Sequence, residues 1–293
     1  MKKRPCFPLF ITITFFVLQP SGTPSPLYGA SPSENPEKQP LWELRVAATA
    51  ARLPHYIGSD EYRNYLFPLP YLIYRGEFFQ ADRDNMRTVF FKNGNFETDL
   101  SLWGNPPVPG HNSARTGMEE LDALIEIGPA MRYYFQRNGS RDSLYLKGAI
   151  RTAFSVGWEG GPEIRYQGLH GSMHLVLRNA SLFKDKKTRF RLSSGIHFAD
   201  SNFNSYFYEV DAEDVAPGRP FYATGGGYSG FSFAGSITRQ LLPYLTLGCY
   251  GRWDNINGAS YTDSPLVGTE NNYTIGTMLI FTLAKSKLMH RGK

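Results

Sequence analysis

Apolar and polar residues alternate along most of the chain. In residues 143–157, "SLYLKGAIRTAFSVG", the even-numbered positions from Leu144 to Val156 are mainly apolar, whereas Lys147, Arg151 and Ser155 occupy odd positions. A period of two residues is typical of a β-strand with one apolar face. The same pattern recurs in "NFETDLSLWG" (95–104), "TRFRLSSGIHF" (188–198) and "NYTIGTMLIFTL" (272–283).

Weaker versions of this pattern predict further strands, separated by turn sequences such as "KNGN", "NGSRD", "KDKK" and "NING". These further strands are expected at Trp42–Ala50, Tyr65–Tyr74, Met86–Phe91, Ala123–Phe135, Glu163–Leu177, Phe203–Tyr208, Tyr228–Arg239 and Tyr244–Asp254. We find no convincing helical period over ten or more residues, and no domain boundary. The fold class is therefore all-β, with about twelve antiparallel strands in a range of about ten to fourteen.

Alternation alone fits two architectures. A soluble sandwich or lipocalin-like barrel buries its apolar face, whereas an outer-membrane barrel turns that face to lipid and its polar face to an enclosed lumen. Three features favour a transmembrane antiparallel β-barrel: strands of membrane-spanning length, aromatic residues near strand ends, and charged residues in the middle of strands. The charges expected in the lumen are Glu97, Asp99, Glu126, Arg132, Lys147 and Arg151.

The beginning of the chain resembles an export signal. A basic "MKKR" precedes the apolar run Phe7–Leu18, which is too short to span a bilayer as a helix. We expect a signal peptide over 1–30, a polar, Pro-rich periplasmic linker over 31–40, an outer-membrane barrel over 41–283 and a basic tail over 284–293.

Composition narrows the class of protein. Of the 293 residues, 41% are hydrophobic, 19% charged and 15% aromatic. A mean hydropathy of −0.35 is far from that of a helical membrane protein, and the aromatic content is too high for a disordered chain. The net charge of +5 includes Lys2, Lys3 and Arg4 of the export signal, and no basic stripe with interleaved aromatics suggests a nucleic acid partner.

Two prolines interrupt an aromatic strand in "PHYIGSDEYRNYLFPLPYLIYRG" (54–76). Pro68 and Pro70 remove two hydrogen-bond donors on one side of that strand, so we expect them at a rim, in a bulge or inside the lumen. The preceding Gly58-Ser59-Asp60 suits a tight turn, in which Gly58 adopts positive φ. With a periplasmic N-terminus, this turn lies at the outer mouth.

This stretch also resembles a known family. Its pattern Pro-x-Tyr-x-Gly-Ser-Asp-x-Tyr, followed by a Pro-containing aromatic strand, resembles the opening signature of the MipA/OmpV family of outer-membrane proteins. The segments "ELDALIEIGPAMRYYF" (120–135), "YFYEVDAEDVAPGRPFYATGGGYSGFSFAGSI" (206–237) and "GASYTDSPLVG" (258–268) are similar to later parts of that family. The motif residues carried over to the predicted rim turn are Tyr56, Gly58, Ser59, Asp60 and Tyr62.

The resemblance implies a non-enzymatic scaffold for peptidoglycan-remodelling enzymes, in contact with outer-membrane lipid. Its implied partners are a lytic transglycosylase and a penicillin-binding protein. The alternatives are a small-solute channel or a surface antigen or adhesin, and a lipid-modifying barrel enzyme. One departure from the family is "TLAKSKLMHRGK" (282–293), which continues past the aromatic Phe281 that fits a terminal assembly signal.

Other candidate chemistry is weak, and we expect no cofactor and no metal. "GGGYSG" (225–230) matches a dinucleotide motif but precedes an alternating strand instead of a helix. His170 and His174, and likewise Ser193 and His197, are about 13 Å apart if each pair lies in one strand. That separation is too long for a shared metal or for a nucleophile and its base, but a cross-strand partner stays open. The lumen charges Glu126 and Arg132 are expected to face Lys147 and Arg151, either lining a pore or filling the barrel.

Overall fold

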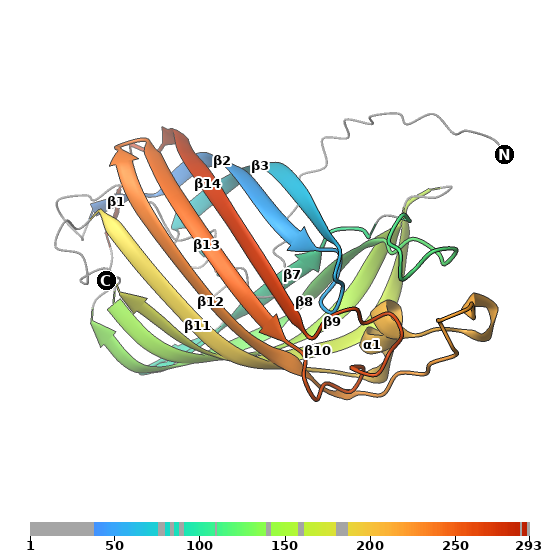
Figure 1. Cartoon of the computed structure of the whole chain (residues 1–293). Coiled ribbons are helices and arrows are strands. Elements are labelled where there is room, and N and C mark those ends of the chain that lie inside the picture. The colour runs from blue at the N-terminus through green and yellow to red at the C-terminus, as the bar shows by residue number, and fades with distance from the viewer. Residues whose placement is uncertain are drawn as a thin grey trace.

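The structure is a computed structural model that describes residues 38–75, 80–82, 85–87, 91–108, 110–138, 142–157, 161–179, 187–287 and 289–291. Ten long antiparallel strands dominate this part of the chain (Figure 1). They are β2 (Trp42–Pro54), β3 (Tyr62–Arg75), β7 (Phe96–Asn105), β8 (Ala123–Asn138), β9 (Asp142–Gly157), β10 (Glu163–Asn179), β11 (Thr188–Ala199), β12 (Gly227–Leu242), β13 (Leu245–Asn255) and β14 (Asn271–Lys285). The expected all-β, antiparallel fold class is confirmed.

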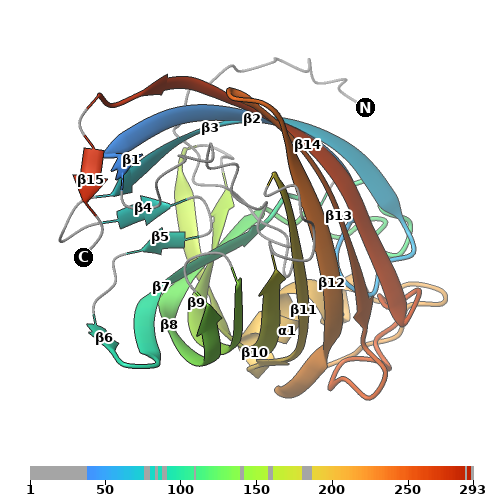
Figure 2. The ribbon, with the colours of Figure 1, turned by 90° about the vertical axis from the view of Figure 1, so that its left-hand side faces the viewer.

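Neighbours in the chain are neighbours in the sheet, and the first long strand meets the last. The order is β5-β4-β3-β2-β14-β13-β12-β11-β10-β9-β8-β7-β6, where β4 (Gln80–Asp82), β5 (Asn85–Arg87) and β6 (Phe91–Asn93) are short. The pairing of β2 with β14 places Val46 opposite Phe281. Figure 2 shows the strands curled round a common axis. Among the described residues no pairing joins β3 to β7, so the sheet is barrel-like but not closed there.

The sheet has a polar inside and an apolar outside. On β9, Arg151 is 5% exposed and Ala149 and Ala153 are also buried, whereas Ile150 between them is 63% exposed. Apolar side chains such as Met131 and Met173 are likewise exposed on β8 and β10. This arrangement is the reverse of a soluble β-protein and matches an outer-membrane barrel, as the alternation predicted.

Ten long strands are slightly fewer than the expected number of about twelve. Phe203–Tyr208 was wrongly predicted as a strand, because it lies in the helix α1 (Ser201–Tyr208). The Asp200 side chain caps this helix by accepting a hydrogen bond from the Phe203 N–H at 2.9 Å. Phe203 and Phe207, one helical turn apart, are both buried. The other expected strand that does not form one long element is 86–91. There the structure describes only the short β5 and the start of β6, and 88–90 lie outside the described residues.

Long connections and α1 gather at one end of the sheet, at the lower right of Figure 1. We call this end the cap; its described connections are 55–61, 110–122, 200–226 and 256–270, including the 3-10 helix η1 (Ala212–Asp214). The cap has its own apolar core, in which the rings of Tyr208 and Tyr261 stack at 3.7 Å. Long loops that face outward are typical of outer-membrane barrels. Here the connection 76–95, which contains β4, β5 and β6, is also long and lies at the other end.

The opposite end holds both ends of the described chain. Lys38–Pro40 (β1) pairs with Met289–Arg291 (β15) in a separate two-stranded sheet. The expected linker and the expected basic tail thus contribute one short strand each. The expected signal peptide 1–30 and linker residues 31–37 lie outside the described residues. No helix in the described ranges has the length and apolar character needed to cross a membrane.

The two prolines lie in the middle of β3, in an unbroken register with β2. Pro68 is opposite Ala48 and Pro70 is opposite Val46. The His55 N–H donates to the Glu61 carbonyl at 2.9 Å, and these two residues are opposite each other where this register continues beyond Pro54 and Tyr62. Hydrogen-bonded pairs recur at every second residue of an antiparallel ladder, so the odd-numbered residues of β2 and β3 bond to each other. The nitrogens of both prolines therefore point away from β2, toward the side on which the described chain gives β3 no long partner.

Candidate functional site

A chain of buried polar side chains crosses five neighbouring strands inside the barrel. Arg151 on β9 donates to Glu126 Oε2 on β8 at 2.8 Å, and His170 Nδ1 on β10 lies 2.8 Å from the same oxygen. His170 Nε2 lies 3.2 Å from His197 Nδ1 on β11, and His197 Nε2 lies 3.0 Å from Ser232 Oγ on β12. The cross-strand register brings these residues together, since His170 is opposite Arg151.

This chain has the donors and acceptors of a Ser-His-His-Glu relay. If the Ser232 hydroxyl donates to His197, each neutral imidazole can donate onward, and the last proton is accepted by Glu126. The serine that hydrogen-bonds His197 is therefore Ser232 on the neighbouring strand, and not Ser193 on the same strand. Ser232 is only 2% exposed, so its hydroxyl is shielded from the barrel interior.

The other predicted lumen charges also lie on the inner face. Asp99 and Arg132 form a buried ion pair at 2.5 Å. Glu97 accepts from Arg137 Nη2 at 2.7 Å. Lys147 lies directly opposite Arg132 in the register and is half-buried. Most of these charges thus stabilise one another across neighbouring strands.

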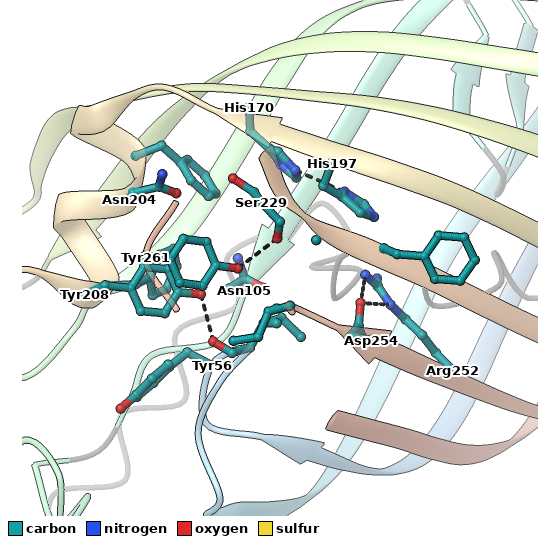
Figure 3. A pocket seen from close by; sticks show the side chains of 16 residues that line it. Tyr56, Asn105, His170, His197, Asn204, Tyr208, Ser229, Arg252, Asp254 and Tyr261 are labelled. Carbon is teal, nitrogen blue, oxygen red and sulfur yellow. Dashed lines mark hydrogen bonds and ion pairs between the residues drawn. The ribbon is translucent and has the colours of Figure 1, made fainter. Parts of the chain in front are cut away.

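A small pocket lies where the cap meets this polar interior (Figure 3). We call it the cap pocket. Its aromatic walls come from the cap and from the start of β12, and its polar side comes from β10, β11 and the end of β13. The aromatic residues are Tyr56, Phe203, Phe207, Tyr208, Phe231 and Tyr261; the main polar ones are His170, His197, Arg252, Asp254 and Asn204.

Arg252 and Asp254 are two residues apart on β13, so both point inward. Arg252 Nε donates to Asp254 Oδ1 at 2.7 Å, and Nη2 contacts the same oxygen. Figure 3 shows this pair across the pocket from His170 and His197. Sequence reasoning missed both residues, although the alternation in "GRWDN" (251–255) already placed Arg252 and Asp254 on one face.

The predicted rim turn lies in the cap and is bonded to a distant loop. Gly58 has φ +99°, and its carbonyl accepts from the Gly268 N–H at 2.8 Å. Asn272 donates to the Ser59 carbonyl at 2.7 Å. A Cβ on Gly58 would lie 3.3 Å from Ile256. Glycine is therefore suited here both by its backbone angle and by the close approach of Ile256.

The remaining motif residues extend this network. The Tyr56 hydroxyl donates to the Leu266 carbonyl at 2.7 Å, and burial raises the pKa of Tyr56 to about 12. The Tyr62 hydroxyl accepts from the Tyr273 N–H at 3.2 Å, whereas Asp60 is exposed. The bonds of Tyr56 and Gly58 join the loop 55–61 to the loop 256–270, and the Tyr62 bond joins the start of β3 to the start of β14.

A second link joins the turn to the loop 110–122. The Asn112 side chain donates to His55 Nδ1 at 2.9 Å and to Ser59 Oγ at 3.3 Å. The Ser113 backbone N–H donates to Glu61 Oε1 at 2.6 Å, and the Ser113 hydroxyl also contacts this oxygen. These bonds lower the pKa of Glu61, and burial lowers the pKa of His55.

Metal binding has no support in the described part of the chain, where no group of three His, Cys, Asp or Glu residues could hold an ion. The interior instead offers paired charges, a histidine relay and one pocket with aromatic walls. Such an arrangement can bind a small molecule or seal the barrel.

Comparisons with known proteins match most of the chain to one family model. The family model described as "MltA-interacting protein MipA" matches residues 46–283. No curated protein matches the chain. Two structures of hydrocarbon-transporting proteins are among those similar to it. The toluene transporter TbuX of Ralstonia pickettii is 7% identical with a TM-score of 0.24, over 85% of this chain and 70% of that chain. The CymD monoaromatic hydrocarbon channel is 9% identical with a TM-score of 0.25, over 83% and 67%.

A third similar structure is the outer-membrane protein OprG of Pseudomonas aeruginosa. It is 9% identical with a TM-score of 0.19, over 84% of this chain and 95% of that chain. TM-scores of this size carry no functional information.

Proposed function

The chain belongs to the MltA-interacting protein MipA family, and from this premise we propose that it is a non-enzymatic scaffold that binds a lytic transglycosylase at the outer membrane. The observation that carries this proposal is the family match over 46–283, which includes nearly all of the barrel. The inside-out sheet and the family together make the protein an outer-membrane β-barrel, in contact with lipid. A penicillin-binding protein as a second partner is part of the same proposal.

The proposed binding surface lies at the end opposite the cap. A peptidoglycan enzyme in the periplasm cannot reach the Gly58 turn if the long loops face outward. Both ends of the described chain lie at the other end, where β1 and β15 form a short sheet. The two-stranded sheet at this end is a surface that a periplasmic partner can contact. This supports the scaffold role without any contribution from the cap.

The burial of Ser232 supports a role without catalysis. A serine nucleophile must reach the substrate carbonyl while it bonds its base. His197 satisfies the Ser232 hydroxyl, but at 2% exposure that hydroxyl has little room for a substrate. The relay is then a structural network that joins β8 to β12.

Capture from intact cells tests the scaffold role. The full chain, a variant that lacks residues 286–293, and an Asn112→Ala variant are crosslinked, purified in mild detergent and probed for lytic transglycosylases. We expect capture by the full chain and by Asn112→Ala, and loss of capture without the tail. A heat-dependent shift in gel mobility must show that every variant is folded. Absence of any lytic transglycosylase from the full-chain sample would refute the proposal.

A small-solute channel is the second candidate, favoured by the charged residues along the inner face. Its test is conductance in planar bilayers. A channel predicts ion selectivity that changes in Arg151→Glu, because this buried guanidinium lies on the lumen side of β9. The scaffold proposal predicts no open-pore conductance for the unaltered protein or for the Arg151→Glu variant.

A further inference from the structure

The connection that follows α1 projects beyond the strand ends of the cap (Figure 1). Its residues 210–222 form a short hairpin, which we call the cap hairpin and whose two ends pair through backbone hydrogen bonds of 2.9 and 3.1 Å. At the tip, the Arg219 N–H donates to the Ala216 carbonyl at 2.8 Å. Pro217 and Gly218, the latter with φ +81°, are the residues that a type II turn prefers at its two central positions.

Arg219 holds the cap hairpin against a second connection of the cap. Its Nε donates to the Asp214 carbonyl within the hairpin at 2.9 Å. Its Nη1 donates to the carbonyls of Ala114 and Thr116, at 3.0 Å each, and the residue is buried. The proline turn and this anchor fix the hairpin before a partner arrives, which lowers the entropy cost of binding.

The cap hairpin exposes apolar side chains that lipid does not cover. Phe221 is 59% exposed and Val215 is 50% exposed, and Pro217 and Pro220 are exposed as well. Apolar side chains on the outside of the strands face lipid, but this hairpin lies beyond the strand ends, in water. An aromatic side chain exposed on a well-anchored loop is suited to the core of a binding surface.

The charged side chains around this hairpin are almost all acidic. With His neutral, the four connections of the cap contain twelve Asp and Glu residues and two Arg, a net charge of −10, whereas the whole chain carries +5. All twelve carboxylate side chains belong to exposed or partly exposed residues, whereas Arg115 and Arg219 are buried. Asp211 and Glu213 are exposed within the hairpin itself. Such a surface attracts a cationic partner and repels an anionic one.

We propose that the cap hairpin and the acidic surface around it form a docking site for cationic amphipathic peptides. The apolar face of the peptide covers Phe221 and Val215, and its Lys or Arg side chains pair with Asp211 and Glu213. A purely apolar partner would leave the carboxylates unpaired, and a purely polar cation would leave Phe221 in water. This site does not depend on the scaffold role, whose proposed surface lies at the other end of the barrel.

Binding to the full chain in phosphatidylcholine nanodiscs tests the site with three peptides of about 14 residues. The first combines Lys and Leu at the spacing of an amphipathic helix, the second has Glu in place of every Lys, and the third contains Lys alone. Empty nanodiscs give the background that is subtracted. We expect saturable binding of the Lys/Leu peptide, at least about tenfold weaker binding of the Lys peptide, and no binding of the Glu/Leu peptide.

Salt gives a second measure of the same interaction. Raising NaCl from about 50 to about 500 mM should weaken binding of the Lys/Leu peptide at least about tenfold, because salt screens exposed charges. Equal affinity for either of the other peptides would overturn the proposal. Absence of binding above the empty nanodiscs, up to about 100 μM of the Lys/Leu peptide, would also overturn it.

Variants assign the binding to the cap hairpin. Phe221→Ser should weaken binding of the Lys/Leu peptide at least about tenfold, as should Asp211→Asn combined with Glu213→Gln. Tyr244→Ser is the matched control for Phe221→Ser, because Tyr244 is 55% exposed between β12 and β13, at the end opposite the cap. Unchanged affinity in either folded hairpin variant, or an equal loss in Tyr244→Ser, refutes the assignment. If the hairpin variants do not fold, the three-peptide comparison on the unaltered chain still decides the proposal.

Discussion

His197 on β11 hydrogen-bonds Ser232 on β12 through Nε2 and Oγ at 3.0 Å, and both side chains are buried. Ser232→Ala removes the hydroxyl that bonds this nitrogen and leaves a buried imidazole atom without that partner. We expect the free energy of unfolding to fall by about 1–3 kcal/mol. Urea unfolding of the barrel in detergent measures the change as a lower midpoint.

Ser229→Ala, on the same strand, is the control for this prediction. The Ser229 hydroxyl contacts the Gly227 carbonyl at 3.5 Å, and the residue is partly exposed. Its removal should change the free energy of unfolding by less than about 0.5 kcal/mol. Equal effects of the two substitutions would show that the His197 contact does not stabilise the barrel.

Gly58→Ala should loosen the cap. The new Cβ must tolerate φ +99° and a contact of 3.3 Å with Ile256, which together cost about 1–3 kcal/mol. We expect faster amide hydrogen exchange in the loop 256–270, because this loop forms several hydrogen bonds with the turn. Gly148→Ala, where the Cβ meets nothing within 4 Å, should leave exchange in that loop unchanged. Protection of 256–270 that survives Gly58→Ala would contradict this reading of the turn.

The loop 110–122 should detach from the turn on acidification. Burial lowers the pKa of His55, and hydrogen bonds from Ser113 lower the pKa of Glu61, so the folded state binds fewer protons at both sites than the unfolded state. Their stabilisation is therefore complete above the ordinary His value of 6.5 and is lost as the pH falls through the lowered folded pKa values. Protonation of His55 Nδ1 also removes the acceptor for Asn112.

Hydrogen exchange followed at several pH values from 7.5 down to 3 measures this loss as reduced protection factors in 112–118. Protection of the β9 amides serves as the internal control, because β9 does not contact His55. In His55→Gln, the part of the change that His55 causes below its ordinary pKa of 6.5 should vanish, whereas the part that Glu61 causes below its ordinary pKa of 4.5 should persist. If His55→Gln shows the same pH dependence of protection as the unaltered chain, groups other than His55 cause the loss.

Asp200 should determine whether α1 is stable. Its carboxylate accepts from the Phe203 N–H at 2.9 Å at the first turn. Asp200→Ala should cost about 0.5–2 kcal/mol, measured as a lower urea midpoint and faster exchange in 203–208. Asp211→Ala is a matched control, since Asp211 precedes η1 but makes no capping hydrogen bond through its side chain. Equal effects of the two changes would argue against the cap.

The sequence predicted the barrel because a two-residue period is a local property. In residues 143–157, alternation places Arg151 and Ile150 on opposite faces, and the structure turns Arg151 inward and Ile150 outward. Residues 203–208 misled the prediction because six residues, mostly aromatic, fit a strand or a helix. Asp200, three residues before the first buried aromatic, was the local signal for a helix.

The cap pocket could not be predicted, because its residues meet only through the register of distant strands. His170 and His197 lie on adjacent strands, but their distance depends on the alignment of Ser172 with His197. Arg252 reaches the same cavity from β13. The helix α1 reaches it from a connection that the sequence pattern predicts to be a strand. Sequence periodicity gives the face of each strand but not this alignment.

Pro68 and Pro70 also affect how the protein behaves beside its neighbours in a crowded bilayer. A bare strand edge is a template onto which an adjacent chain can zip, and that reaction leads to aggregation. With donors missing at two alternate positions of β3, an incoming strand would find acceptors but no matching N–H groups there. The prolines therefore disfavour pairing of β3 with a strand of another copy at these two positions.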